Sequence, residues 1–382
     1  MEEPTQDPRE ALAKEYDTIH NRLFILQVLF VIALLSAFQF TGASATLANG
    51  LAARFGENLW YVVNAVYTVI AVFGFAACMF PLSCYSGHVL EHHYELSNET
   101  FGDWFADFTK SLLIDLVLAT VLFSVIYALL RWMPGWWWLF ATIFYILFAV
   151  VISTLAPVLI MPLFHKFEPL EEGDLTQAVR AMMEEAGIKV VGIFKWGLEA
   201  KTKTANAAFA GIGRTKRIIL GDTLLSGYSQ EEILAILAHE VGHYKNRDTL
   251  RLMFTSSVLA LIGFYVSHLC LTGLSGLLGF ANIYDIGAAP LFIFSLFVFS
   301  LVSMPIANMH SRIREFAADA YAIDKMESAD ALVSAFEKLA DQNLSNKEPA
   351  AWAEILLHSH PSISRRIERA LGTRHQEPDT KN

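Results

Sequence analysis

Residues 238–243 read Ala-His-Glu-Val-Gly-His, an H-E-x-x-H motif inside a helical pattern, and a membrane-length apolar run begins nearby at Leu252. On an α-helix, His239 and His243 are four residues apart and lie on one face. Their imidazoles can bind one metal ion, and Glu240 is close enough to act as a general base on what the ion binds. The stretch predicts a zinc protease whose chemistry takes place at the bilayer.

The composition indicates an integral membrane protein. Of the 382 residues, 54% are hydrophobic and only 17% are charged, which is too apolar for an ordinary soluble chain of this size. The net charge of -10 argues against a general nucleic-acid binder, because such proteins are usually basic on at least one face. The expected partners are therefore the lipid bilayer and a substrate, with no nucleic acid.

Six stretches are long enough to cross a hydrocarbon core, which takes about 20 apolar residues in a helix. They are residues 23–40, 59–80, 111–130, 136–163, 252–274 and 289–309. Prolines at positions 157 and 162 predict a kink or break near the end of the fourth span. We expect about six spans, with a seventh as the alternative.

The first span is expected to stay in the mature protein. The residues before it are rich in acidic side chains, which do not suit a signal peptide, and the apolar run is longer than a typical signal sequence. The alternative is cleavage at Ala43-Ser44-Ala45, which resembles a signal-peptidase site.

The short loops predict the orientation in the membrane. Three basic residues precede the first span: Arg9, Lys14 and Arg22. In contrast, the loops 41–60 and 272–290 contain only Arg54 between them. By the positive-inside rule, both termini and residues 165–251 lie on the cytoplasmic side, which in a bacterium is the inner face of the inner membrane.

The expected fold is mainly α: a polytopic helical membrane bundle with a small inserted α+β catalytic unit. Helical spacing over 175–186, apolar runs at 190–194, 205–209 and 217–220, and a helix from about Gln230 make up that unit. The five parts are residues 1–164 with four spans, 165–251 with the catalytic unit, 252–309 with two spans, 310–371 with the C-terminal helices, and a disordered tail at 372–382.

A third metal ligand is expected in residues 311–319, which read Ser-Arg-Ile-Arg-Glu-Phe-Ala-Ala-Asp. Catalytic zinc takes three protein ligands and keeps one position for water, and Glu315 is the candidate for the third. Asp319 lies one helical turn later and would accept a hydrogen bond from the free ring nitrogen of a ligating histidine. One zinc ion per chain is predicted, and Glu240 would carry the proton from water to the leaving amine.

The metal is predicted to lie close to the membrane. If the motif helix and the helix of Glu315 continue unbroken from their spans, the ion is roughly 10 to 15 Å from the apolar boundary. The substrate should therefore be a peptide or protein that is lipidated, embedded in the membrane or presented near the bilayer.

Several motifs together resemble the type I CaaX prenyl proteases, integral-membrane zinc metalloendopeptidases of the gluzincin group. They are Leu90-Glu91 with residues 94–100, residues 162–167, residues 205–211, residues 237–243, residues 315–319 and His360-Pro361. The resemblance implies removal of the C-terminal tripeptide from prenylated proteins, and the chain resembles a bacterial-style member of the family. Eukaryotic members resemble a seven-span cage around a chamber, whereas six spans are expected here.

The resemblance also implies roles for individual residues. It gives His239, His243 and Glu315 as ligands and Glu240 as the base. It implies an edge strand beside the cleft that pairs with an extended peptide, formed by Ala205, Asn206, Ala207, Ala208 and Phe209. Asn206 would help to hold the peptide, and His360 would stabilise the oxyanion.

Other interpretations stay open. The substrate could be misfolded membrane proteins instead of prenylated ones, and a zinc-containing scaffold without catalysis is a further alternative. The group at Glu91, His92, His93 and Glu95 is expected to be a solvated helix instead of a second metal site, because adjacent histidines point to different helix faces. For Arg312 and Arg366, pairing with carboxylates near the site and surface solvation are equally favoured.

Overall fold

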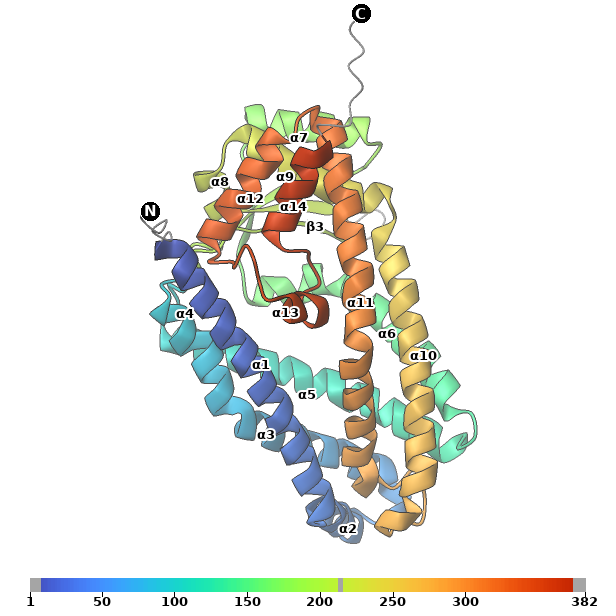
Figure 1. The fold of residues 1–382 in the computed structure, drawn as a ribbon. Coiled ribbons are helices and arrows are strands. Elements are labelled where there is room, and N and C mark those ends of the chain that lie inside the picture. The colour runs from blue at the N-terminus through green and yellow to red at the C-terminus, as the bar shows by residue number, and fades with distance from the viewer. Residues whose placement is uncertain (1–7, 212–215, 374–382) are drawn as a thin grey trace, which may run out of the picture.

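The computed structural model describes residues 8–211 and 216–373. Long helices α10 and α11 run from the end of the molecule near α2 to the opposite end, where α7, α8, α9, α12 and α14 gather, and α1 runs from the same end to the near end of α12 (Figure 1). Most of the expected tail, residues 374–382, lies outside the described residues. Residues 372 and 373 do not belong to it, because α14 (Ile363–Thr373) continues through them.

Six helices are long and apolar enough to cross a membrane within the described part of the chain. They contain α1 (Pro8–Phe40), α3 (Trp60–Cys84), α5 (Phe101–Trp132), α6 (Trp137–Leu155), α10 (Asp248–Leu274) and α11 (Ala289–Met326). After α6 the chain makes a π-helical turn, Ala156–Ile160, and a 3₁₀ turn, Met161–Leu163. The break lies where Pro157 and Pro162 each remove a backbone N–H, as the sequence predicts.

The segment between the first two spans is not the loop that the sequence analysis expects. It forms α2 (Ala43–Phe55) and a 3₁₀ turn, Glu57–Leu59. The hydroxyl of Ser44 is fully buried, donates to the carbonyl of Gly287 at 2.6 Å and lies 2.6 Å from the hydroxyl of Tyr67. These bonds hold α2 against α3 and against the 3₁₀ turn Ile286–Ala288 that precedes α11, with Ser44 buried and Ala43 exposed.

The catalytic unit contains a four-stranded sheet in the order β1-β2-β4-β3. Its strands are β1 (Phe167–Pro169), β2 (Ile193–Trp196), β3 (Ala207–Ala210) and β4 (Arg217–Gly221). β2 and β4 run parallel, and the other two pairs are antiparallel. Three strands lie near their predicted places, whereas β1 has only three residues, too few for a visible alternation. β3 lies at the edge of the sheet.

The described part of the unit also contains six shorter helices. They are α7 (Asp174–Glu185), α8 (Asp222–Gly227), α9 (Gln230–Lys245), α12 (Asp330–Gln342), α13 (Ala351–Leu356) and α14. The start of α9 is fixed by a capping box, in which Glu232 N–H donates to Ser229 Oγ and Ser229 N–H donates to the Glu232 carboxylate. Apolar side chains of α9, including Leu237, are fully buried with Leu220 of β4 and Leu332 of α12.

The catalytic unit is tied to the membrane helices beside α5. Ser97 and Thr202 form an isolated antiparallel bridge. The ammonium group of Lys201 pairs with Asp107 of α5 and lies 3.1 Å from Glu99. These contacts attach the chain just before β3 to the loop that precedes α5, within the segment that also carries the family-like motif at 94–100.

Candidate metal and catalytic site

Gly242 allows α9 and α11 to lie unusually close together. A Cβ at this position would lie 3.0 Å from both the Cα and the carbonyl oxygen of Ala318, a backbone that cannot easily move away. Ala318 is fully buried and lies between Glu315 and Asp319 on α11. The missing side chain therefore brings the histidine face of α9 against the carboxylate face of α11.

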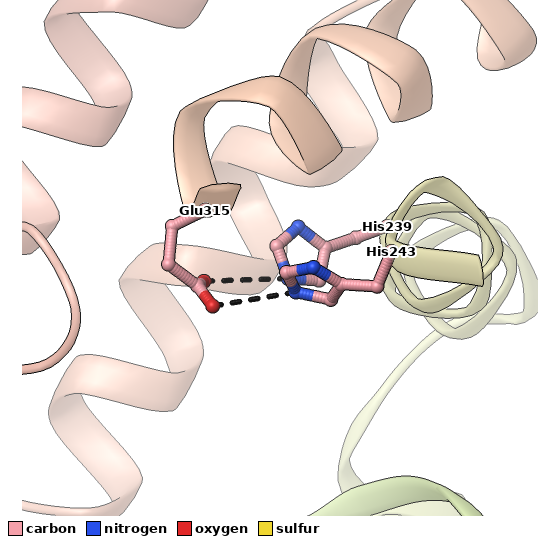
Figure 2. A group of neighbouring side chains, drawn as sticks. All are labelled: His239, His243 and Glu315. Carbon is pink, nitrogen blue, oxygen red and sulfur yellow. Dashed lines mark hydrogen bonds and ion pairs between the residues drawn. The ribbon is translucent and has the colours of Figure 1, made fainter. Parts of the chain in front are cut away.

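The three candidate ligands meet at this contact, as Figure 2 shows. The Nε2 atoms of His239 and His243 lie 3.5 and 3.3 Å from the two carboxylate oxygens of Glu315, and 3.1 Å from each other. All the candidate ligand atoms lie within 4.8 Å of one another. Within the described part of the chain, no other group of histidine, cysteine or carboxylate side chains is arranged to hold a metal ion.

The polar atoms of this cluster suit a cation. Glu315 Oε2 is buried and has no hydrogen-bond partner within the described residues. The Nδ1 atoms of His239 and His243 each face a carboxylate, so each Nδ1 carries a proton, and each Nε2 offers a lone pair once its ring is neutral. Two lone pairs and an unsatisfied carboxylate oxygen converge on one point, which is the donor set of a catalytic zinc site.

Each histidine is held by its own aspartate. His239 Nδ1 donates to Asp319 Oδ1 at 2.8 Å, and His243 Nδ1 donates to Asp248 Oδ2 at 3.0 Å. The first contact involves the residue that the sequence analysis names, whereas Asp248 is absent from that analysis. Such carboxylates fix the tautomer and orientation of a ligating imidazole and raise its basicity.

Asp248 reaches His243 because α9 and α10 are not one helix. The predicted distance of the metal from the membrane requires that both helices run unbroken from their spans; this condition fails for α9, although α11 does run unbroken through Glu315. α9 ends at Lys245, and Arg247 has a positive φ of 55° before α10 begins. This turn directs the buried side chain of Asp248 back toward His243, which helical spacing alone would not do.

We predict that Asp248→Asn weakens metal binding about 10- to 100-fold, the usual loss when a carboxylate behind a metal-ligating histidine is removed. Asparagine keeps the volume but removes the negative charge that holds the Nδ1 proton. Equilibrium dialysis of the metal against wild type, Asp248→Asn and the exposed Asp324→Asn measures the effect. If Asp248→Asn bound the metal as tightly as the control, His243 would not depend on this contact.

Arg366 joins the two carboxylates of α11. Its Nε and Nη2 donate to the two oxygens of Asp319 at 2.9 and 2.6 Å, and Nη2 lies 3.6 Å from Glu315. Its guanidinium also lies 4.0 Å from the centre of the Phe336 ring, and the side chain is buried. Of the two interpretations that the sequence left open for this residue, pairing with carboxylates is correct.

Arg312 has a different role. Its Nη1 donates to the backbone carbonyls of Glu354 at 2.8 Å and His358 at 2.7 Å. It therefore pairs with neither of the acids of the site, and it is not simply solvated. Instead it holds the chain between α13 and α14, which carries His360.

Glu240 is positioned to exchange a proton beside the candidate ligands. It is half-buried and lines the same cavity as His239 and Glu315. Burial raises the pKa of its carboxyl, while the two neighbouring histidines oppose this shift. A raised pKa brings a carboxylate closer to the neutral range, in which a general base works most efficiently.

A cavity of about 710 Å³ connects many of the predicted site residues, although His243 is not among those that line it. His239, Glu240, Glu315, His360, Ala205, Asn206 and Ala207 line it, and so do Tyr16, Asp17 and His20 of α1. His360 Nε2 lies 3.5 Å from Glu315, with 64% of its side chain exposed. Ala208 and Phe209 of the predicted substrate strand do not line the cavity, and the Phe209 ring lies beside Tyr244 instead.

The group around Glu91 is not a second metal site within the described residues. Glu91 accepts a hydrogen bond of 2.6 Å from the Tyr16 hydroxyl and lies 3.7 Å from His20. His92 Nδ1 donates to the carbonyl of His88 within its own helical segment. The expected solvation holds for His92 and His93, whereas Glu91 is half-buried against α1.

Two family models match this chain. The model described as peptidase family M48 matches residues 169–374, more than half of the chain. The chain belongs to this family. A second model, described as CAAX prenyl protease N-terminal, five membrane helices, matches residues 8–166. That part contains α1, α2, α3, α5 and α6, and α2 with 13 residues is too short to cross the membrane.

Relatives of this M48 peptidase cover most of its length. The "Uncharacterized metalloprotease YhfN" of Bacillus subtilis is 29% identical, over 94% of this chain and 85% of the relative. CAAX prenyl protease 1 of Saccharomyces cerevisiae is also 29% identical, over 75% of this chain and 67% of the relative. The crystal structure of S. mikatae Ste24p matches with a TM-score of 0.83 and 23% identity, over 97% of this chain and 90% of that one.

These comparisons establish the class of the protein. It is a multi-pass integral membrane metalloprotease that belongs with the CAAX prenyl proteases and has the fold of Ste24p. The resemblance and the fold class inferred from the sequence are therefore confirmed. The family membership implies a metal ion, in agreement with the donor set described above.

Proposed function

We propose that this M48 peptidase is a zinc-dependent endopeptidase that cleaves peptide bonds at the membrane face. His239, His243 and Glu315 hold one zinc ion, and Glu240 is the general base. The observation that carries the proposal is that His239, Glu240 and Glu315 line one cavity, while His243 Nε2 lies 3.3 Å from Glu315 and 3.1 Å from His239 Nε2 beside an unsatisfied carboxylate oxygen. A structural zinc site would have a fourth protein ligand in place of a base.

The side chains divide the work of hydrolysis. When bound, the zinc ion would supply Lewis acidity, making a water more acidic and polarising the scissile carbonyl. Glu240 takes a proton from the attacking water and delivers it to the leaving amine. His360, exposed to the cavity 3.5 Å from Glu315, is the candidate donor to the negative charge that develops on the carbonyl oxygen.

The peptide is held by the edge strand. β3 lies at the end of the sheet, and Ala205, Asn206 and Ala207 line the cavity beside the candidate ligands. An extended peptide can add to such an edge through main-chain hydrogen bonds. Asn206 is exposed to the cavity and offers its amide group to the bound chain.

Zinc binding should weaken as the pH falls. Burial lowers the pKa of His239, but its contacts with Asp319 and Glu315 outweigh burial and raise this pKa to about 9, and the pKa of His243 is raised as well. At neutral pH the metal-free His239 is therefore protonated, and zinc must displace that proton.

We predict that the apparent zinc affinity falls about tenfold or more for each pH unit below 9. The stability of the metal-free protein should depend on pH in the opposite direction. Protonation of His239 stabilises the metal-free fold at low pH, and this contribution disappears as the pH rises through 9. Zinc titrations between pH 6 and pH 8, in buffers of different ionisation enthalpy, measure both affinity and protons released. A pH-independent affinity would contradict the protonated state of His239.

The proposed substrate is the C-terminal segment of a lipidated protein. The chain covers 67% of CAAX prenyl protease 1 of Saccharomyces cerevisiae, and the cavity extends from the candidate ligands to α1, which enters the membrane. A lipid tail in the bilayer could therefore be continuous with a peptide in the cavity. Turnover of misfolded membrane proteins without a prenyl group is the competing activity.

A matched pair of peptides separates the two activities. The purified protein in lipid nanodiscs is given a farnesylated peptide and its unprenylated twin, and the products are identified by mass spectrometry. We expect release of a C-terminal tripeptide with a clear preference for the farnesylated form. Equal cleavage of both peptides would favour the quality-control activity, and cleavage of neither would contradict a peptidase.

We also propose that the catalytic unit faces the cytoplasm. The support is the basic residues before the first span and the near absence of such residues in the loops at the opposite end. Residue 382 would then be cytoplasmic, and a C-terminal tag should be digested by protease added to inside-out vesicles. Digestion only in right-side-out cells would reverse the orientation.

A further inference from the structure

Every second residue of β3 directs its backbone N–H and C=O groups toward the free edge of the sheet. β3 pairs with β4 in an antiparallel register that sets Ala207 opposite Leu220 and Ala208 opposite Ile219. Gly221 N–H donates to the carbonyl of Asn206 at 2.9 Å, so Asn206 directs its backbone groups toward β4. In an antiparallel strand this direction alternates, so the N–H and C=O groups of Ala205, Ala207 and Phe209 point away from β4.

At Ala205 these outward groups are already bonded. Ala205 N–H donates to Asn343 Oδ1 at 2.9 Å, and Asn343 Nδ2 donates to the Ala205 carbonyl at 3.2 Å. One side-chain amide thus makes both of the bonds that a residue of a neighbouring strand would make. At Lys203, the N–H donates to the carbonyl of Leu96 and the C=O accepts from Gln342 Nε2.

Beyond Ala205 the edge is open. Within the described residues, β3 has β4 as its only strand partner, and β3 is the last strand of the sheet. Ala207 and Phe209 therefore offer outward N–H and C=O groups to an added peptide, whereas those of Ala205 are already bonded to Asn343. Asn343, Ala205 and Ala207 line the same cavity as Glu240.

Asn343 is held at a fixed distance from the motif helix. It is the residue that follows α12, and α12 packs against α9. Lys338 and Ser334 of α12 both bind the carboxylate of Glu232 on α9, at 2.8 and 2.6 Å. The position of the side-chain amide is therefore set by the same helix that carries Glu240.

We infer that Asn343 is a stop that limits how many residues of a bound peptide can follow the cleaved bond. An added strand is more stable when it runs antiparallel to its neighbour, so the C-terminal end of the peptide points toward Ala205. A short C-terminal segment ends before Asn343, whereas a longer one must displace its amide or leave the strand. The inference rests on the proposed peptidase function and makes the enzyme selective for bonds close to a C-terminus.

The test is a series of peptides with one cleavable sequence, extended one residue at a time at the C-terminal end. A second series is extended at the N-terminal end. For wild-type protein in nanodiscs we expect kcat/KM to fall about tenfold once the segment after the cleaved bond reaches Asn343, the order expected when a pair of neutral hydrogen bonds must be broken. Asn343→Ala should reduce this fall to less than about threefold.

Two further variants control for a general disturbance of the loop. Asn343→Asp keeps the size and the acceptor for Ala205 N–H but loses the donor, so it should relax the length dependence partly. Asn346→Ala alters the same loop, where Asn346 binds Asp17 and not β3, and should keep the wild-type dependence. The readout is the ratio of kcat/KM for long peptides to kcat/KM for short ones, so a change in overall activity cancels.

The outcomes separate this inference from the function on which it rests. Cleavage of no peptide would overturn the peptidase function and the stop together. Cleavage with a flat C-terminal length profile in wild type would overturn the stop alone, whatever the variants do. The stop would also be overturned if Asn343→Ala kept the wild-type dependence on C-terminal length, or if this variant changed the dependence on N-terminal length instead.

Discussion

Glu240→Gln is expected to reduce kcat for peptide hydrolysis about 10²- to 10⁴-fold, the range that a positioned general base contributes. Glutamine keeps the shape of the side chain but cannot accept a proton from water. Because Glu240 is not among the three candidate ligands, the zinc content should stay near one ion per chain. Single-turnover assays together with metal analysis of the same sample measure both quantities.

The control for this variant is Glu231→Gln. Glu231 lies on the same helix, in its exposed first turn, where a charge change should have little effect on hydrolysis. Loss of zinc from Glu240→Gln would mean that the residue is needed to build the site. Full activity with full zinc would rule out Glu240 as the base.

Arg366→Ala is expected to be the most damaging substitution outside the four catalytic side chains. Arg366 makes two hydrogen bonds to the buried Asp319, which in turn holds His239. Removing one partner of a buried ion pair leaves the other charge uncompensated, at a typical cost of about 3 to 5 kcal/mol. Zinc affinity should fall about 10- to 100-fold as well, because the aspartate behind His239 is no longer held in place.

The neighbouring Arg365→Ala is the matched control. Arg365 binds Glu354 at 2.7 Å, but its own side chain is 56% exposed, so its loss should cost less than the loss of the buried Arg366. Arg366→Lys tests the geometry, since lysine restores the charge but not the two parallel bonds. Thermal inactivation rates and zinc titrations compare the variants. Equal behaviour of Arg365→Ala and Arg366→Ala would contradict the role of Arg366.

The elements that local rules govern could be predicted from the sequence. The capping box of Ser229 and Glu232 begins α9 where expected, and the four-residue spacing of the histidines sets them on one face. The six spans follow from apolar length alone. The contact between this face and Glu315 was inferred from the number of ligands that catalytic zinc requires, and the structure has these residues together.

The parts that could not be predicted depend on contacts between distant segments or on single backbone turns. Asp248 faces His243 only because Arg247 adopts a left-handed conformation, which an arginine at this position does not predict. Asn343 meets Ala205 across 138 residues of sequence. α2 is short and apolar, so its composition does not distinguish a buried helix from a loop between two spans.

Anomalous diffraction at the zinc absorption edge, from crystals of the purified protein, locates the metal. We expect one zinc peak per chain, bound by His239 Nε2, His243 Nε2 and Glu315, with no fourth protein ligand. A peak at another position, a fourth protein ligand, or no peak in a protein that hydrolyses peptides would contradict it.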